Sequence, residues 1–412
     1  MRINNHIYSY FLFLFSIIPI TIMIGSAVSV LNILLIDLSF ILLIIYLGNY
    51  SFLKNQNLFY FFILYVYLIF NSLISLDFNL GLNRNFGFIR IILFFIAVNF
   101  FFNQKLFFNK VIKVWCLTIL VVLADVCFEF YFGKNIIGFG GLYGDRIVSF
   151  FKDEPIVGGY LNCFYLLIIG FLIDSFKNNK IFSSKIQFFI VLFLIFYLIC
   201  IILTGERSNT IRASLGLFVF IIYFNEIKTK IKILSLVAVF IFTTILISNS
   251  SFLKMRFINQ IDSLLNNKNI YFQLYDSGYH VFKNYPIFGV GNKNYRVETC
   301  REFRKNEKIE IENYECSTHP HQIYFELLSE HGIFGTVIIL FVLYKLIFSK
   351  IKNTILTKNN YLKKGCLIYL LFIFIPIIPS GAFFNNYMLT IFIINLSIFY
   401  GSDKKLNIFK NY

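Results

Sequence analysis

Two histidines flank a proline in the segment STHPHQIYFELLSEHGIFG, residues 317–335, and their imidazoles are the side chains best suited to proton transfer in this chain. An imidazole can take up a proton near neutral pH, which makes His321 a candidate general base. The alternative is structural, because a histidine at a helix start can instead hydrogen-bond the backbone. We predict that Thr318 caps a short helix with Pro320 in its first turn, so that His321 lies on a packed face. This helix is expected to end at Gly332.

The segment TGERSNTIRASLG, residues 204–216, contains two arginines that could meet a bound anion. Arg207 lies in a short turn between two apolar stretches, and Arg212 lies about one helical turn into the second stretch. An arginine at a membrane edge is costly and suggests a functional site, and its planar fork matches phosphate oxygens. The structural alternative for Arg207 is a side chain that reaches to lipid headgroups. Three further arginines, Arg84, Arg90 and Arg146, lie in or beside polar segments between apolar stretches, on the same side of the membrane as Arg207.

The segment YFQLYDSGYHVFKNYPIFGVG, residues 271–291, precedes another arginine, Arg296. Aromatic residues at helical spacing predict an amphipathic helix before Pro286. The glycines that follow permit either a plain turn or a close approach of the backbone to a ligand. We hypothesise that four side chains surround one outward-facing cavity for an anionic, lipid-anchored substrate: Arg207, Arg212, Arg296 and His321.

Two of the seven cysteines, Cys300 and Cys316, lie close before the histidines, whereas the other five fall in or at the ends of apolar stretches. A disulfide is expected in an oxidising compartment, and a loop of this size would gain about 3 kcal/mol from it. One alternative is two unpaired thiols. Another is a zinc site formed by these cysteines with His319 and His321, but the spacing does not match known zinc motifs, so no metal is expected.

The elements that must position these residues are apolar. Of 412 residues, 58% are hydrophobic and 14% are charged, which indicates a polytopic membrane protein rather than a soluble domain. We predict an all-α membrane helix bundle that forms a single integral domain over residues 1–412. About twelve transmembrane helices are expected, at residues 7–24, 28–48, 58–76, 86–102, 112–132, 156–175, 186–203, 210–225, 233–248, 333–349, 365–379 and 383–400.

The net charge of +16 would suggest a nucleic-acid partner in a soluble protein. Here the lysines occur in alternate short breaks between the apolar stretches, so the positive-inside rule accounts for them and predicts a cytoplasmic location for both termini. No nucleic-acid partner is expected. The first apolar stretch is interpreted as a transmembrane helix and not as a cleaved signal peptide. The longest outward break, residues 249–332, is predicted to be a structured periplasmic loop that carries the histidine motif.

Four segments together resemble the bacterial O-antigen ligase and O-antigen polymerase superfamily. TGERS resembles the family turn SGERS, and NYPIFGVG resembles NPIFGVG. HPHQIYFELLSEHGIFG resembles the pattern HPHN.Y...L.E.G..G, and PSGAFFNNY follows before the last apolar stretch. The resemblance covers the chain from about Gly133 onward. Gln322 departs from the asparagine that is usual in the family, but it keeps an amide at this position.

The resemblance implies a glycosyltransferase of lipopolysaccharide biosynthesis in the inner membrane, with its active site on the periplasmic side and with no metal or other cofactor. The donor would be a glycan on undecaprenyl diphosphate. The acceptor hydroxyl would belong to lipid A–core in a ligase, towards which we lean, or to a second lipid-linked glycan in a polymerase. Carried over by motif, His321 would be the general base, while Arg207 and Arg296 would bind the diphosphate. Arg212 and His319 are less securely placed as further substrate-binding residues.

Two other classes of function fit a polytopic chain. A transporter of lipid-linked oligosaccharide would also place arginines in a membrane cavity. The histidine motif and the lack of visible repeated halves disfavour it. A structural membrane scaffold would lack a polar outward cavity.

Overall fold

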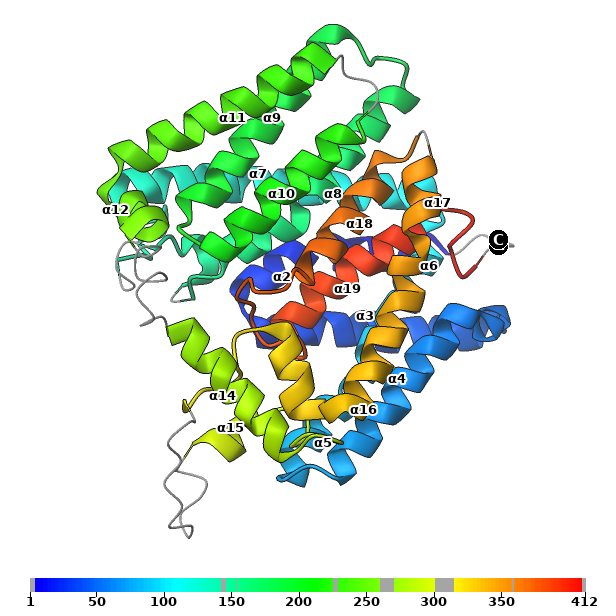
Figure 1. Ribbon diagram of the computed structural model, residues 1–412. Coiled ribbons are helices and arrows are strands. Elements are labelled where there is room, and N and C mark those ends of the chain that lie inside the picture. Colours follow the sequence, from blue (N-terminus) through cyan, green and yellow to red (C-terminus); the bar gives the residue numbers. More distant parts are fainter. Residues whose placement is uncertain are drawn as a thin grey trace.

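The computed structural model describes residues 4–141, 146–152, 154–224, 229–259, 270–300, 315–357 and 359–409, and within these ranges the secondary structure is helical, without strands (Figure 1). The predicted all-α polytopic bundle is therefore confirmed. The predicted number of spans is not: eight of the described helices are long and apolar enough to cross a membrane, or nine if a bent pair counts as one span.

The bent pair consists of α1 (Asn5–Ser16) and α2 (Ile18–Ile24), which meet at 44° just before Pro19. The eight candidate spans are α3 (Ser26–Leu47), α4 (Gln56–Leu73), α5 with α6 (Phe78–Phe86, Ile89–Phe102), α7 (Lys105–Phe132), α8 (Val157–Asn178), α9 (Ser184–Leu203), α11 (Thr229–Asn249) and α16 with α17 (Ile323–Leu346, Ile351–Leu356). Short 3-10 turns lie at Ser51–Lys54, Ser149–Phe151 and Phe348–Lys350.

The remaining three predicted spans overlap shorter helices. These helices are α10 (Arg207–Ile222), α18 (Tyr361–Ile373) and α19 (Asn386–Gly401). The apolar sequence after α18 continues, but Pro376 and Pro379 cannot extend a helix because proline lacks the N–H and clashes with the preceding turn. Residues 374–385 therefore form a non-helical segment, here named the proline loop, between α18 and α19.

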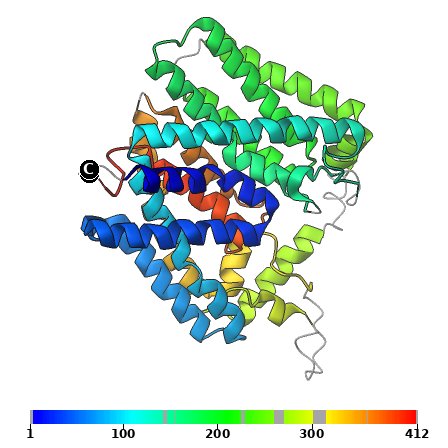
Figure 2. The ribbon, with the colours of Figure 1, turned by 180° about the vertical axis from the view of Figure 1, so that it is seen from behind.

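The centre of the bundle is built by α8, α18 and α19. Gly170 on α8 and Gly365 on α18 allow these helices to touch, because a Cβ on Gly170 would lie 2.5 Å from the carbonyl oxygen of Tyr361, and one on Gly365 would lie 2.2 Å from that of Leu166. Figure 1 shows α18 and α19 between the group α9–α11 and the group α4, α5 and α16. Seen from behind, α1 and α2 lie between α7 and α3 (Figure 2).

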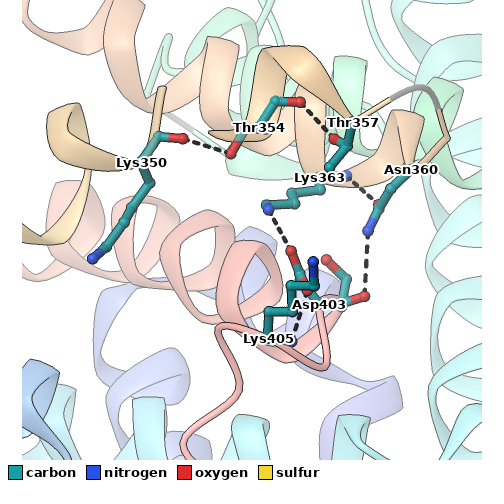
Figure 3. Close-up of polar contacts among 8 residues, drawn as sticks. Lys350, Thr354, Thr357, Asn360, Lys363, Asp403 and Lys405 are labelled. Atoms are coloured by element: carbon teal, nitrogen blue, oxygen red, sulfur yellow. Dashed lines mark hydrogen bonds and ion pairs between the residues drawn. The ribbon is translucent and has the colours of Figure 1, made fainter. Parts of the chain in front are cut away.

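A polar network ties the ends of α18 and α19 together (Figure 3). Lys363 forms an ion pair with Asp403, and both side chains are largely removed from solvent. Asn360 caps α18 by accepting the N–H of Lys363 at 3.0 Å, and its amide donates to the carbonyl oxygen of Ser402 at 3.4 Å. Asp403 also accepts the N–H of Lys405 at 2.8 Å. This end of the bundle therefore holds the C-terminal segment against the core.

Within the predicted long loop, the described residues form α12 (Ser251–Lys254), a π-helical turn (Met255–Asn259), α14 (Ile270–Asn284), α15 (Tyr295–Thr299) and the first turns of α16. The amphipathic helix predicted before Pro286 corresponds to α14. The parts of this loop at 260–269 and 301–314 lie outside the described residues. The next helix, α16, joins the histidine motif directly to a membrane span.

Candidate functional site

The histidine motif starts its helix later than the sequence predicted. Helix α16 begins at Ile323, and its N-cap is Gln322, whose side-chain oxygen accepts the N–H groups of Tyr324 and Phe325 at 2.7 and 2.9 Å. The predicted cap at Thr318 and the predicted helical position of His321 are wrong. His321 precedes the helix with φ 54°, a left-handed conformation that no helix interior allows. The amide at position 322 therefore has a defined structural role.

Helix α16 kinks at Gly332, where the short helix was predicted to end, and the glycine-rich segment repairs the break. The N–H groups of Ile333 and Phe334 donate to the carbonyl oxygens of Pro286 and Ile287 at 2.8 and 3.1 Å. In return, the N–H groups of Val290 and Gly291 donate at 2.9 Å each to carbonyl oxygens on the first part of α16, those of Ser329 and Glu330. These four hydrogen bonds thus satisfy backbone groups that the kink releases from the helix.

The proline loop is held by residues from both sides. The N–H of Ser380 donates to the carbonyl oxygen of His321 at 2.8 Å. The N–H of Phe383 donates to both carboxylate oxygens of Glu326 at 2.9 and 3.0 Å. Only 1% of the surface of Glu326 is exposed. Its carboxylate fixes the loop against the histidine motif.

The two histidines of the motif differ in their hydrogen bonding. The ring of His319 lies between two partners, with Nε2 3.3 Å from the carbonyl oxygen of Ser380 and Nδ1 2.9 Å from the hydroxyl of Thr318. A carbonyl only accepts, so Nε2 carries the proton and Nδ1 accepts from Thr318. The ring of His321 lies 4.0 Å from that of His319, and its nitrogens bond to no side chain or backbone group among the described residues. His321 is therefore the histidine whose ring is available to a substrate.

Both imidazoles are held in the neutral form. Burial and, to a smaller extent, the neighbouring His321 lower the pKa of His319 to about 4, against the opposing effect of the Ser380 carbonyl. Burial also lowers the pKa of His321 below its ordinary value of 6.5. A neutral imidazole can accept a proton, so the environment keeps His321 competent as a base at neutral pH.

Arg212 reaches the same proline loop from α10. One of its terminal nitrogens donates to the carbonyl oxygen of Pro379 at 3.1 Å. Pro379 directly precedes Ser380, whose backbone is hydrogen-bonded to both histidines. The side chain is buried, and its Nε has no hydrogen-bond partner in the described part of the chain. The hydroxyl of Tyr275 on α14 donates to the carbonyl oxygen of Ile377 at 3.0 Å, and its ring stacks on Phe325. Arg212 and the histidine motif thus meet through the backbone of one loop.

Arg207 begins α10 and has two further arginines near it. Nε of Arg256 donates to the carbonyl oxygen of Gly205 at 3.2 Å, and a terminal nitrogen of Arg146 donates to that of Pro155 at 3.1 Å. Burial lowers the pKa of Arg256, and the guanidinium groups of Arg146 and Arg207 lower it further. The three cations thus form one positive surface, here named the arginine surface. The sequence offered only a weak indication of a role for Arg256, because a cation in an apolar stretch was its one unusual feature.

The acidic residue of the GERS turn has a structural position within this surface. Glu206 is buried and accepts the N–H groups of Gly158 and Gly159 at 2.6 and 3.2 Å, which caps the start of α8. It also accepts from the amide of Asn209 at 2.7 Å. Burial raises its pKa, while these hydrogen bonds and the nearby charge of Arg146 lower it. Glu206 thus connects the arginine turn to the start of α8, the most buried of the eight candidate membrane spans.

Arg296 lies on α15, beside the later turns of α14. The hydroxyl of its neighbour Tyr295 shares a 2.7 Å hydrogen bond with that of Ser277 on α14. The residue of α14 that contacts the histidines is Tyr271, whose ring packs against His321. The rise of a helix separates these two positions of α14 by about 9 Å. Arg296 is exposed, and its predicted role stays a prediction. The disulfide Cys300–Cys316 links the end of α15 to the segment before the histidines.

Fold and site together define a multi-pass helical membrane protein with two histidines and several arginines at one end of the bundle. Residues 190–340 match the family model described as O-antigen ligase, a range that extends from α9 through the arginine turn and the histidine motif into α16. This match supports the resemblance to the O-antigen ligase and O-antigen polymerase superfamily that the motifs predicted. A comparison with curated proteins finds no match.

Proposed function

We propose that this protein is a glycosyltransferase of the inner membrane that moves a glycan from undecaprenyl diphosphate to a hydroxyl of lipid A–core. The observation that carries the proposal is the position of His321: its neutral ring has no hydrogen-bond partner among the described residues, and its backbone is bonded to the loop that also binds Arg212. A base and a buried cation are thereby held in one structural unit. The match to the O-antigen ligase family supports the same class of reaction.

The proposed reaction begins with deprotonation of the acceptor. A sugar hydroxyl is a weak nucleophile until a base removes its proton, and His321 takes this role. The oxygen attacks the anomeric carbon of the donor while the bond to the diphosphate breaks, which inverts the anomeric centre. The negative charge that develops on the leaving diphosphate is neutralised by guanidinium groups, for which Arg207 and its neighbours on the arginine surface are suited. The electron pair leaves with undecaprenyl diphosphate, and no metal is required.

The location follows from the lysines. The breaks that carry them share one end of the bundle with the end of α19, so we assign this end and both termini to the cytoplasm. The histidine motif and arginine surface then face the periplasm. The lipid tail of the donor would remain in the bilayer while its diphosphate meets the arginine surface at the membrane edge.

The test is transfer by the purified full chain in EDTA, with an undecaprenyl diphosphate-linked glycan as donor and either lipid A–core or a second lipid-linked glycan as acceptor. His321→Ala should lower the rate by about 10²–10⁴-fold, the usual contribution of a general base. His280→Ala is the matched control, because His280 lies on α14 and pairs with Asp276 outside the site. Product from the second acceptor alone would identify a polymerase. Movement of intact donor across vesicles without lipid diphosphate release would instead identify a transporter.

A further inference from the structure

Two arginines outside the arginine surface bind the same atom. Arg84, near the end of α5, and Arg90, near the start of α6, donate to Oδ1 of Asn386 at 2.9 and 2.7 Å. Asn386 is the first residue of α19, directly after the proline loop. Two guanidinium groups are therefore held side by side around one neutral amide oxygen.

This arrangement leaves positive charge and hydrogen-bond donors unused. A guanidinium has five N–H groups, and the described contacts of each arginine use one terminal nitrogen. Nε of Arg90 is buried and has no hydrogen-bond partner in the part of the chain that the structure describes. A neutral amide cannot compensate two like charges at such close range. An anion between the guanidinium groups would supply both the charge and the acceptors.

The nearby carboxylates do not take this role. Glu326 and Glu330 lie close enough to Arg84 to interact electrostatically, as Asp37 does with Arg90. However, no carboxylate of the described residues forms an ion pair with either arginine. Glu326 accepts from Phe383 and Glu330 accepts from the N–H of Tyr295 at 3.3 Å. These acids balance the local charge from a distance and leave the guanidinium donors available.

The pair lies on the opposite flank of the proline loop from Arg212. Arg212 bonds the loop at Pro379, the histidines bond it at Ser380, and the arginine pair meets its end at Asn386. A transfer reaction needs two substrates at one base, and in the proposed function both are lipids that carry phosphate. Cations on both flanks of the loop match that requirement.

We propose that Arg84, Arg90 and Asn386 form a second anion site, which binds a phosphate group of the acceptor lipid. Guanidinium groups bind phosphate oxygens in paired hydrogen bonds, and two neighbouring arginines provide the donors for one such group. The assignment of this phosphate to the acceptor rests on the proposed function. The anion site itself rests on the geometry of the three side chains.

The binding test uses undecaprenyl diphosphate as the probe and native mass spectrometry of the full chain to count bound lipids. Wild type should bind two molecules per chain at saturation, and Arg84→Gln/Arg90→Gln should bind one. Asn386→Asp should also bind one, because the new carboxylate would pair with both arginines and occupy the site. The Asp variant should melt at the same temperature or higher, so its loss of binding cannot come from misfolding. A single lipid on wild type, or two on both variants, would overturn the site.

A second binding experiment separates the sources of the anion. Inorganic pyrophosphate is added to the wild type loaded with two lipids. Displacement of one lipid supports a site that recognises the phosphate alone, and retention of both supports a site that recognises phosphate on a lipid.

The kinetic test then separates this inference from the proposed function. In the transfer assay, Arg84→Gln/Arg90→Gln should raise the acceptor KM by about tenfold or more, the loss expected for hydrogen bonds to charged groups, with the donor KM unchanged. Arg207→Gln should change the donor KM instead. If transfer depends on His321 but the acceptor KM of the double variant is unchanged, the inference fails and the function stands. If no transfer occurs but the lipid count still falls from two to one, the anion site stands without the function.

Discussion

The backbone N–H of Ser380 donates a 2.8 Å hydrogen bond to the carbonyl oxygen of His321. The bond crosses from the proline loop to the histidine motif and coincides with the left-handed backbone of His321. The imidazole is thus aimed by the loop between α18 and α19 and not by the helix that follows it in sequence. Residues that fix the loop should therefore affect catalysis without touching substrate.

Glu326→Gln should lower kcat with little change in either KM. The carboxylate accepts the N–H of Phe383 with both oxygens, and an amide would retain one acceptor oxygen and add an unpaired donor in a buried position. A loss of about 1.5–3 kcal/mol in loop anchoring corresponds to a rate decrease of roughly 10- to 100-fold. Steady-state kinetics with both substrates would measure this. An unchanged kcat would show that the loop does not aim the base.

The pH dependence of the transfer rate should reflect the protonation of His321. Burial lowers the pKa of His321 below 6.5, so the ring stays a base as pH falls through 6.5, and the acid limb of the rate should lie below that value. The limb should disappear from the residual activity of His321→Ala. A limb at or above pH 6.5 in wild type would contradict the assignment of His321.

The same shifts should make the fold sensitive to acid. The pKa of His319 is about 4 in the folded chain and 6.5 for a free imidazole, so the unfolded chain binds more protons between these values. The stability contributed by the neutral ring is complete above pH 6.5 and is lost as pH falls towards 4. Thermal unfolding of wild type and His319→Gln across this range would show a smaller pH dependence in the variant.

Removal of the disulfide should loosen the histidine motif. Cys300→Ser opens the link between α15 and the segment before His319, with an expected destabilisation of about 2–5 kcal/mol. The transfer rate should fall in the same variant and in reduced wild type. Cys116→Ser is the control, because Cys116 is a free cysteine on α7. Equal melting temperatures for Cys300→Ser and wild type would exclude a stabilising role.

Gly289 should tolerate no side chain. Its φ is 70°, and a Cβ would lie 2.5 Å from the backbone nitrogen of His331 at the α16 kink. Gly289→Ala should therefore prevent the backbone pairing of the two segments and cost about 3 kcal/mol or more in stability. Gly133→Ala isolates the backbone strain, because Gly133 has a φ of 77° with open space around its Cβ position, and it should cost about 1–2 kcal/mol. Equal losses in the two variants, measured by thermal unfolding, would show that packing at the kink contributes nothing.

Local pattern was sufficient to predict several features. Long apolar runs predicted the membrane helices because a helix that crosses the hydrocarbon core of a bilayer must be apolar along its whole length. The order of the GERS turn, the GVG segment and the HPH motif predicted the resemblance that the family match supports, and the glycine in HGIFG marked the point where α16 kinks. Each of these features depends on neighbours in sequence.

Other features required distant partners. The helical start predicted for His321 failed because Ser380, far along the chain, holds its carbonyl oxygen. The burial of Glu326 depends on the proline loop, because the N–H of Phe383 needs an acceptor where water is excluded. The grouping of Arg256 with Arg207, and of Arg84 with Arg90 around Asn386, likewise depends on how helices pack.

The sequence by itself thus determined the class of protein, the helical segments and the residue types that could perform the chemistry. Tertiary structure alone decided which imidazole is available, which carboxylates are buried and which arginines meet. The physical reason is that hydropathy and turn preferences act over a few residues, whereas buried polar groups must find partners across the whole bundle.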